Sequence, residues 1–275
     1  MFGAILVLLF AFSIPAAVIV RRHRTESRRE HLRRQPFPEE WRRVLDHSIP
    51  LYRHLPTPLK EQLHGHINVF LAEKNFEGGG GLTMTDEIRV TIAAQACILL
   101  LNRRTDYYPR LYSIIVYPEE FTVERPLYFS GHHHLEGEET RLGESWPTGA
   151  VVIAWSHARQ GSSDPNDGRN VVFHEFAHQL DQEDGRADGM PVLQRTSSYI
   201  TWARVLGRQY EDLQLRVKSG MASLLDKYGA TNAAEFFAVA TECFFERPRQ
   251  MEAQLPDLYR ELKDFYNQDP ARYDA

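Results

Sequence analysis

The segment His174-Glu175-Phe176-Ala177-His178 constrains this chain more than any other feature of its sequence. Residues four apart lie on one face of a helix, so two imidazoles at this spacing can converge on one tetrahedral metal. The remaining positions are open to a third protein ligand and a water. Glu175 points about 100° away around the helix, so it is placed to take a proton from that water rather than to bind the metal. The segment predicts a zinc-dependent peptidase.

A polar surface helix is the alternative explanation, because the same letters can arise by chance. Its neighbours argue against that alternative, since apolar residues occupy most sides of the expected helix: Val171, Val172, Phe173, Phe176, Ala177 and Leu180. Such a helix is expected to be buried. Buried histidines and carboxylates need partners, because desolvating them alone is costly. A Zn²⁺ ion is such a partner.

A third ligand has to come from elsewhere in the chain, and residues 233–245 offer two candidates. This segment is rich in alanine and aromatic residues and reads as a buried helix that Thr231 or Asn232 can cap. Glu235 and Glu242 are seven residues apart, so they share one face of that helix. Glu235 is also at the right spacing for a capping box with Asn232.

Two longer segments of the sequence resemble those of a known protein family. H-E-F-A-H-Q-L-D from His174 and Y-G-A-T-N-A-A-E-F-F-A-V from Tyr228 together resemble the Mlc titration factor A family of bacterial zinc peptidases. They also resemble, more distantly, the catalytic domain of anthrax lethal factor. The resemblance runs from about Trp41 to about Pro248 and includes residues 76–78, 82–87, 92–97, 117–118 and 143–146. It implies an α+β fold, a mostly helical zincin-type metallopeptidase domain with a small sheet.

Carried over residue by residue, the resemblance implies that His174, His178 and Glu235 bind the metal and that Glu175 is the general base. Glu235 is preferred to Glu242 as the third ligand on the same grounds. Tyr228 would donate a hydrogen bond to the oxyanion that forms during hydrolysis. The alternative for Tyr228 is a loop tyrosine whose ring packs on the core.

Asp181 follows His178 by three residues, and its position in the sequence allows two interpretations. It can accept a hydrogen bond from the His178 imidazole and hold it in place, or it can be solvated at the end of the helix.

The glycine run 77–81 lacks the Lys-Ser/Thr of a phosphate loop and favours a turn. The cluster His132-His133-His134 lies among glycines and acids that indicate an exposed loop, so it is a weak metal candidate.

Residues 148–156 are apolar and β-branched and predict a strand. Zinc peptidases commonly bind an extended substrate as an added strand at a sheet edge. By the resemblance, this strand is the candidate substrate edge, and an ordinary core strand is the alternative. Helices are expected near residues 39–46, 58–74, 86–101, 170–181, 198–219, 233–246 and 255–266, and a further strand is expected at 113–117.

Residues 1–20 carry no charge and would span roughly 30 Å as a helix, the thickness of a bilayer core. Seven arginines and two glutamates follow in residues 21–34. We therefore predict a transmembrane anchor at 1–20, a basic juxtamembrane linker at 21–38 and a zinc peptidase domain at 39–275. The positive-inside rule favours a single pass through the inner membrane, with the catalytic domain in the cytoplasm. Cleavage within residues 13–17 is the alternative, and ordinary members of the family are soluble.

The net charge is −5, so the chain outside residues 21–34 carries −10. An acidic domain without a nucleic-acid motif argues against a nucleic-acid partner. Anionic lipid headgroups better explain the arginines. Cys97 and Cys243 each lie in an apolar helical segment and are expected to be buried free thiols.

Two functions compete at this point. The first is a membrane-anchored zinc peptidase that hydrolyses peptide or protein substrates, with the aminopeptidase-like activity that the resemblance implies. The second is a zinc-stabilised regulatory module that binds a transcriptional repressor, as the family name implies. Replacement of Glu175 by Gln separates them, because it removes the base and leaves the fold.

Overall fold

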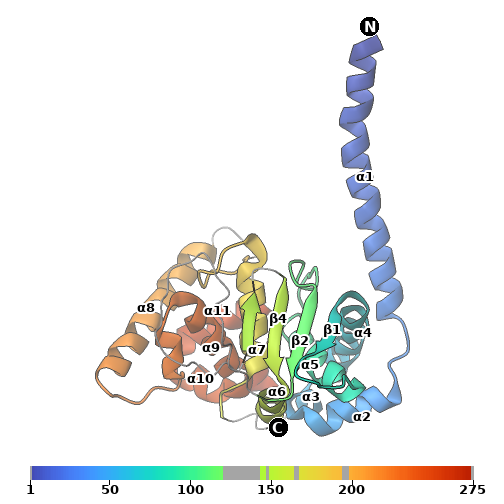
Figure 1. Ribbon diagram of the computed structural model, residues 1–275. Helices are drawn as coiled ribbons and strands as arrows, with labels where there is room; N and C mark the ends of the chain where they lie inside the picture. Colours follow the sequence, from blue (N-terminus) through green and yellow to red (C-terminus); the bar gives the residue numbers. More distant parts are fainter. Residues whose placement is uncertain (1, 120–142, 147–148, 164–166, 194–197, 274–275) are drawn as a thin grey trace.

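Helices surround a small sheet in the computed structural model, which describes residues 2–119, 143–146, 149–163, 167–193 and 198–273. Figure 1 shows the strands in the middle of the domain, with α4 (Thr57–Glu73) on one side and helices from the C-terminal third gathered on the other. The expectation of a mostly helical domain with a small sheet is confirmed. The cluster His132-His133-His134 lies outside the described residues.

The sheet has four strands in the order β1 (Asn75–Gly78), β2 (Ser113–Tyr117), β4 (Ala150–Ala154) and β3 (Gly143–Trp146). The first three run parallel, and β3 pairs antiparallel with β4 at the end of the sheet. β4 is hydrogen-bonded on both sides, to β2 and to β3. The prediction that residues 148–156 form the substrate edge is therefore wrong, because β3 occupies that edge.

The expected helices appear within a few residues of their predicted ends, and the remaining bounds follow in chain order: α2 (Glu39–Ser48), α3 (Pro50–His54), α5 (Asp86–Ile98), α6 (Trp155–Ser163), α7 (Val171–Asp181), α8 (Ser198–Lys218), α9 (Ala233–Glu246), α10 (Pro248–Gln254) and α11 (Pro256–Tyr266). Short 3₁₀ turns occur at Gln182–Asp184, Lys227–Ala230 and Pro270–Arg272. The sequence did not indicate α3, α6 or α10. The strand expected over residues 148–156 spans Ala150–Ala154, and α6 begins directly after it at Trp155.

One hydrophobic core joins the two sides of the domain. α5 is buried almost throughout, and every residue of α9 from Phe236 to Glu246 is buried. The ring of Tyr108 lies 4.9 Å from that of Phe176 on α7, so the loop after α5 contacts the helix that carries the histidine motif. Cys97 in α5 and Cys243 in α9 are buried free thiols, which confirms the prediction for both.

Helix α1 (Phe2–Arg33) extends away from the domain, and only its C-terminal part packs on α4 (Figure 1). Arg29 anchors this contact, since its guanidinium donates to both oxygens of Glu73 at 2.9 and 3.0 Å and to Asp106 at 3.0 Å. Within the described part of the chain, no helix is long and apolar enough to cross a membrane. The side chains of residues 1–17, on which the predicted anchor depends, lie outside the described residues.

Candidate metal and catalytic site

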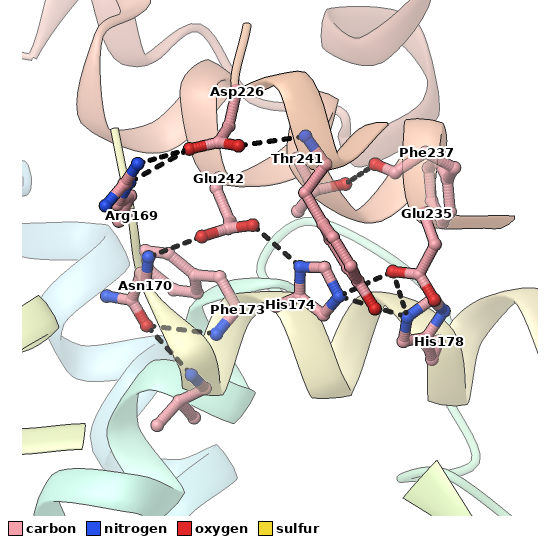
Figure 2. Close-up of polar contacts among 12 residues, drawn as sticks. Arg169, Asn170, Phe173, His174, His178, Asp226, Glu235, Phe237, Thr241 and Glu242 are labelled. Atoms are coloured by element: carbon pink, nitrogen blue, oxygen red, sulfur yellow. Dashed lines mark hydrogen bonds and ion pairs between the residues drawn. The ribbon is translucent and has the colours of Figure 1, made fainter. Parts of the chain in front are cut away.

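Helices α7 and α9 pack against each other and bring the predicted site residues together (Figure 2). Each helix begins at an asparagine cap. The Asn170 side chain accepts from the backbone N–H groups of Val172 and Phe173 at 3.1 and 3.0 Å, and that of Asn232 accepts from Glu235 N at 3.0 Å. Such caps satisfy N–H groups that the first turn of a helix leaves without partners. The caps therefore fix where His174 and Glu235 fall along their helices.

Three potential ligand atoms meet between the two helices. His174 Nε2 lies 3.2 Å from His178 Nε2 and 2.9 Å from Glu235 Oε2, and His178 Nε2 lies 3.3 Å from the same oxygen. Ligands at about 2.0–2.1 Å around a tetrahedral metal are separated by roughly 3.3 Å. The three atoms thus have the spacing of one face of such a tetrahedron, and the donor set fits zinc. Of the described residues, only these form a His, Cys, Asp and Glu group with metal-binding spacing.

Glu235 directs its carboxylate to the histidines. In a full capping box this carboxylate would reach back to the Asn232 backbone N–H. Here only half of that motif is described, the bond from Glu235 N to the Asn232 side chain. The carboxylate oxygen Oε2 instead lies against His174 and His178. Capping and metal binding are compatible at this position, because they use different atoms of Glu235.

Glu242 contacts the opposite side of the His174 ring (Figure 2). His174 Nδ1 donates to Glu242 Oε1 at 2.7 Å, and the backbone N–H of Asn170 donates to Glu242 Oε2 at 2.6 Å. A proton on Nδ1 leaves the lone pair of a neutral imidazole on Nε2, the atom that faces His178 and Glu235. Glu242 therefore orients His174 and selects its tautomer. The seven-residue spacing from Glu235 predicted the shared face but not this role.

The carboxylates dominate the electrostatics of the site. Burial by itself lowers the pKa of His174, but Glu242 and Glu235 outweigh it and raise that pKa well above its ordinary value. Burial likewise opposes ionisation of Glu235, yet its bonds to His174 and His178 hold the pKa of this carboxyl far below its usual range. A negative, half-buried pocket of this kind favours a cation at its centre.

Glu175 and Tyr228 flank the three ligand atoms. Glu175 is 4 % exposed, and its charge is among those that raise the pKa of His174. Tyr228 lies in the 3₁₀ turn before α9, with its ring centroid 6.0 Å from that of His174. Its side chain is 54 % exposed, which contradicts the alternative that the ring packs in the core. An exposed tyrosine whose ring lies beside His174 is accessible to a substrate.

Asp181 is fully buried, which excludes the alternative that it is solvated at the helix end. Its Oδ2 accepts the backbone N–H of Gly189 at 2.9 Å, and its Oδ1 has no hydrogen-bond partner among the described residues. The described bond of Asp181 therefore holds the chain that follows α7. The carbonyl of Gly189 in turn accepts Trp202 Nε1 at 3.0 Å, which ties this loop to α8.

Comparison with known proteins adds to this geometry. Residues 22–267 match the family described as glucose-regulated metallo-peptidase M90. The chain belongs to this family. An uncharacterized protein of Synechocystis sp. is 37% identical over 249 residues, which cover 90% of each chain. Mlc titration factor A of Pectobacterium atrosepticum is 31% identical over 235 residues, covering 84% of this chain and 87% of that protein, and the Yersinia pestis protein of the same name is 28% identical.

Membership in the M90 family identifies the chain as related to metallopeptidases, and it confirms the resemblance drawn from the segments at His174 and Tyr228. A metallopeptidase requires a divalent metal. The group formed by His174, His178 and Glu235 is where the described structure offers ligands for one.

Proposed function

We propose that this protein is a zinc-dependent peptidase. The observation that carries the proposal is the triangle of His174 Nε2, His178 Nε2 and Glu235 Oε2, with sides of 3.2, 2.9 and 3.3 Å. Two imidazole nitrogens and a carboxylate oxygen are the donor set of catalytic zinc sites in peptidases. Zinc in this position would supply a Lewis acid and lower the pKa of water toward 7.

The residues around this triangle suit hydrolysis of a peptide bond. Glu175 accepts a proton from the attacking water and then delivers it to the amine that leaves. The hydroxyl of Tyr228 donates to the carbonyl oxygen as negative charge develops there. Glu242 keeps His174 oriented during both steps through its bond to Nδ1. Burial of Glu175 supports its role, since bulk water has little access to its carboxylate.

The substrate would bind along β3, one of the two edge strands of the described sheet. β3 contacts α7, so a peptide added to it would pass beside the motif helix. Backbone hydrogen bonds from an edge strand hold a peptide extended, without fixing its sequence. Replacement of Ser145 by Pro removes one backbone donor from this strand, and we expect a higher KM with unchanged zinc content. The same substitution at Ser219, after the end of α8, serves as a control.

The decisive experiment measures zinc and hydrolysis on the full-length protein. One zinc per chain is expected in the wild type, and His174→Ala and Glu235→Gln should lose it. Glu175→Gln should retain zinc and lose at least a hundredfold in kcat, because only the base is missing. A folded wild type that binds no zinc when supplied with it contradicts the proposal. Peptides with free and with acetylated N-termini, compared as substrates, test the aminopeptidase activity.

A second function is favoured by one observation: relatives covering most of this chain are named Mlc titration factor A. We propose as an alternative that the zinc-loaded domain binds a transcriptional repressor. Glu175→Gln distinguishes this binding from catalysis, because the variant would still bind the repressor while failing to hydrolyse peptides. Loss of repressor binding in a folded, zinc-loaded Glu175→Gln variant would contradict this alternative.

We also propose that α1 anchors the protein in the inner membrane, with the peptidase domain in the cytoplasm. The support comes from sequence: residues 1–20 carry no charge, and seven arginines follow in residues 21–34. The test is fractionation after carbonate extraction, with protease added from either side of the membrane. Protein in the soluble fraction, or protection of the domain from protease on the cytoplasmic side, would contradict this topology.

A further inference from the structure

A second cavity, of about 1390 Å³, lies where α1 meets the domain. Its walls are α1 from Val18 to Arg33, one face of α4, and the segment that follows α5. The metal ligands are absent from these walls, so the cavity is separate from the proposed catalytic site. Close packing fixes the junction: a side chain at Gly65 of α4 would come within 3.1 Å of the Arg33 carbonyl oxygen.

The cavity is basic within an acidic protein. Eight lysine and arginine residues line it, against five aspartates and glutamates, whereas the chain as a whole carries −5. Five of these cations come from α1, and Lys74, Arg103 and Arg104 add to them from the segments that follow α4 and α5. This arrangement depends on the fold, since Arg103 and Arg104 are far from α1 in sequence.

Several of the acidic residues that line the cavity form ion pairs with two of its arginines, Arg29 and Arg33. Arg29 takes both oxygens of Glu73 and one of Asp106, and Arg33 pairs with Glu26 at 2.9 Å. Of the other six cations, Lys74 donates to two backbone carbonyls and Arg103 stacks on the Phe265 ring. The remaining four make no ion pair with a described residue: Arg21, Arg22, Arg28 and Arg104. Arg21 and Arg28 are two helical turns apart on the same face of α1. Three of the four arginines without ion pairs therefore lie on α1 and the fourth on the segment after α5.

Buried donors in the same wall also lack acceptors. His66 is 5 % exposed, and its Nδ1 lies 2.7 Å from the Tyr107 hydroxyl. Because that hydroxyl accepts from Arg33 Nε at 3.0 Å, it donates to Nδ1, and the ring proton is then on Nε2, which has no hydrogen-bond partner among the described residues. Nη1 of Arg103 is likewise buried without a described partner, while its guanidinium stacks 4.1 Å from the Phe265 ring. Buried polar groups are normally satisfied, so unpaired donors beside a basic cavity indicate a missing acceptor.

We propose that this cavity binds a phosphate-bearing anion, and that the anion is the headgroup of an anionic phospholipid. Phosphate oxygens accept from guanidinium groups in bidentate geometry, which suits the four arginines. The cavity is larger than a single phosphate requires. Val18, Arg21 and Arg22 line it and directly follow the uncharged residues 1–20, so this choice of ligand rests on the proposed membrane position of α1.

The test uses the full-length protein in a nonionic detergent, titrated by calorimetry with dihexanoyl phosphatidylglycerol, dihexanoyl phosphatidylcholine or inorganic phosphate. Binding of phosphatidylglycerol is expected, with at least tenfold weaker affinity for the other two. Arg104→Glu and Arg28→Glu should each weaken phosphatidylglycerol binding tenfold or more. Arg24→Glu is the matched control, because Arg24 is an exposed arginine of the same helix that does not line the cavity; its affinity should stay within twofold.

Equal losses in Arg24→Glu and Arg104→Glu would overturn the proposal, because a general attraction to the basic helix would explain them. Equal binding of phosphatidylcholine would overturn it as well. Phosphate binding as tight as that of phosphatidylglycerol, with the same loss in Arg104→Glu, would overturn the lipid assignment in favour of a soluble anion. Glu175→Gln should bind phosphatidylglycerol like the wild type, so the cavity and the proposed peptidase can fail independently.

Discussion

Arg169 and Asp226 form an ion pair at 2.6 Å that links the start of α7 to the turn carrying Tyr228. Asp226 Oδ2 accepts from Nε and Nη2 of Arg169, and its Oδ1 accepts the backbone N–H of Tyr228 at 2.9 Å (Figure 2). A single carboxylate thus connects the helix with the histidine motif to the proposed oxyanion donor. The position of Tyr228 relative to His174 depends on this link.

Replacement of Asp226 by Ala is expected to lower kcat about tenfold, because a displaced donor stabilises the oxyanion less. Zinc content and KM should change little. The measurement is steady-state kinetics in a double-mutant cycle with Tyr228→Phe. In the Tyr228→Phe background, Asp226→Ala should lower kcat hardly any further. Asp212→Ala removes a comparable pair with Arg216 on α8 and should leave kcat unchanged. Additive losses would show that Asp226 acts independently of Tyr228.

Replacement of Glu242 by Gln should weaken zinc binding about 10- to 100-fold while leaving one zinc per chain at saturation. The carboxylate now accepts from both His174 Nδ1 and Asn170 N, and the single oxygen of glutamine can serve only one of them. Competition with a chelator measures the affinity. Glu235→Gln, which alters a proposed ligand, should lose far more, and equal affinities for the two variants would contradict the division of roles.

Gly189→Ala should destabilise the loop after α7 and disturb the start of α9. Gly189 has φ +74°, and a Cβ there would approach the Ala233 carbonyl oxygen at 2.4 Å, two residues before Glu235. Gly220→Ala is the control, since its φ is +65° and a Cβ would meet nothing within 4 Å. Both variants carry the cost of left-handed backbone, about 1–2 kcal/mol. Chemical denaturation should show a larger loss for Gly189→Ala, together with weaker zinc binding.

Stability should fall as the pH decreases from about 6.5 toward 4, because burial lowers the pKa of His66 from 6.5 to about 4. Above pH 6.5 the histidine is neutral in both folded and unfolded chains. Between pH 6.5 and 4 the unfolded chain binds a proton at His66 more readily than the folded chain does, so acid favours unfolding. The free energy of unfolding should fall by roughly 3 kcal/mol once the pH is below 4. His66→Gln should flatten this slope in denaturation curves. His54→Gln, at an exposed position, should not alter it.

The sequence predicted the helices of the site well because their signals are local. The cap, the apolar surround and the four-residue spacing all lie within residues 170–181, and Glu235 sits at a fixed distance from its own cap, Asn232. The difference between Glu235 and Glu242 could not be predicted from spacing alone. Both share one face, and the offset between α7 and α9 decides which carboxylate meets Nε2 of His174 and which meets Nδ1.

The sheet was harder to predict, because strand order is a property of distant segments. β1 and β3 have four residues each, and β1 ends in glycine, so neither carries a strong strand signal. β4 was recognised as a strand from its β-branched residues. Its internal position followed only from the pairing with β3. The burial of Asp181 could not be predicted for a similar reason, since the loop that buries it returns to it at Gly189.

The reactivity of the two buried cysteines reports local unfolding of the helices that contain them. Burial raises the pKa of Cys97 well above its ordinary value and that of Cys243 to about 12, so neither thiol reacts readily while the helices stay closed. Cys97 lies in α5, whereas Cys243 directly follows Glu242 in α9. Alkylation timed with and without zinc would therefore separate opening of the metal-binding helix from opening of the core. Loss of metal should expose Cys243 before Cys97, and the order of labelling would then reveal how far the site holds the domain together.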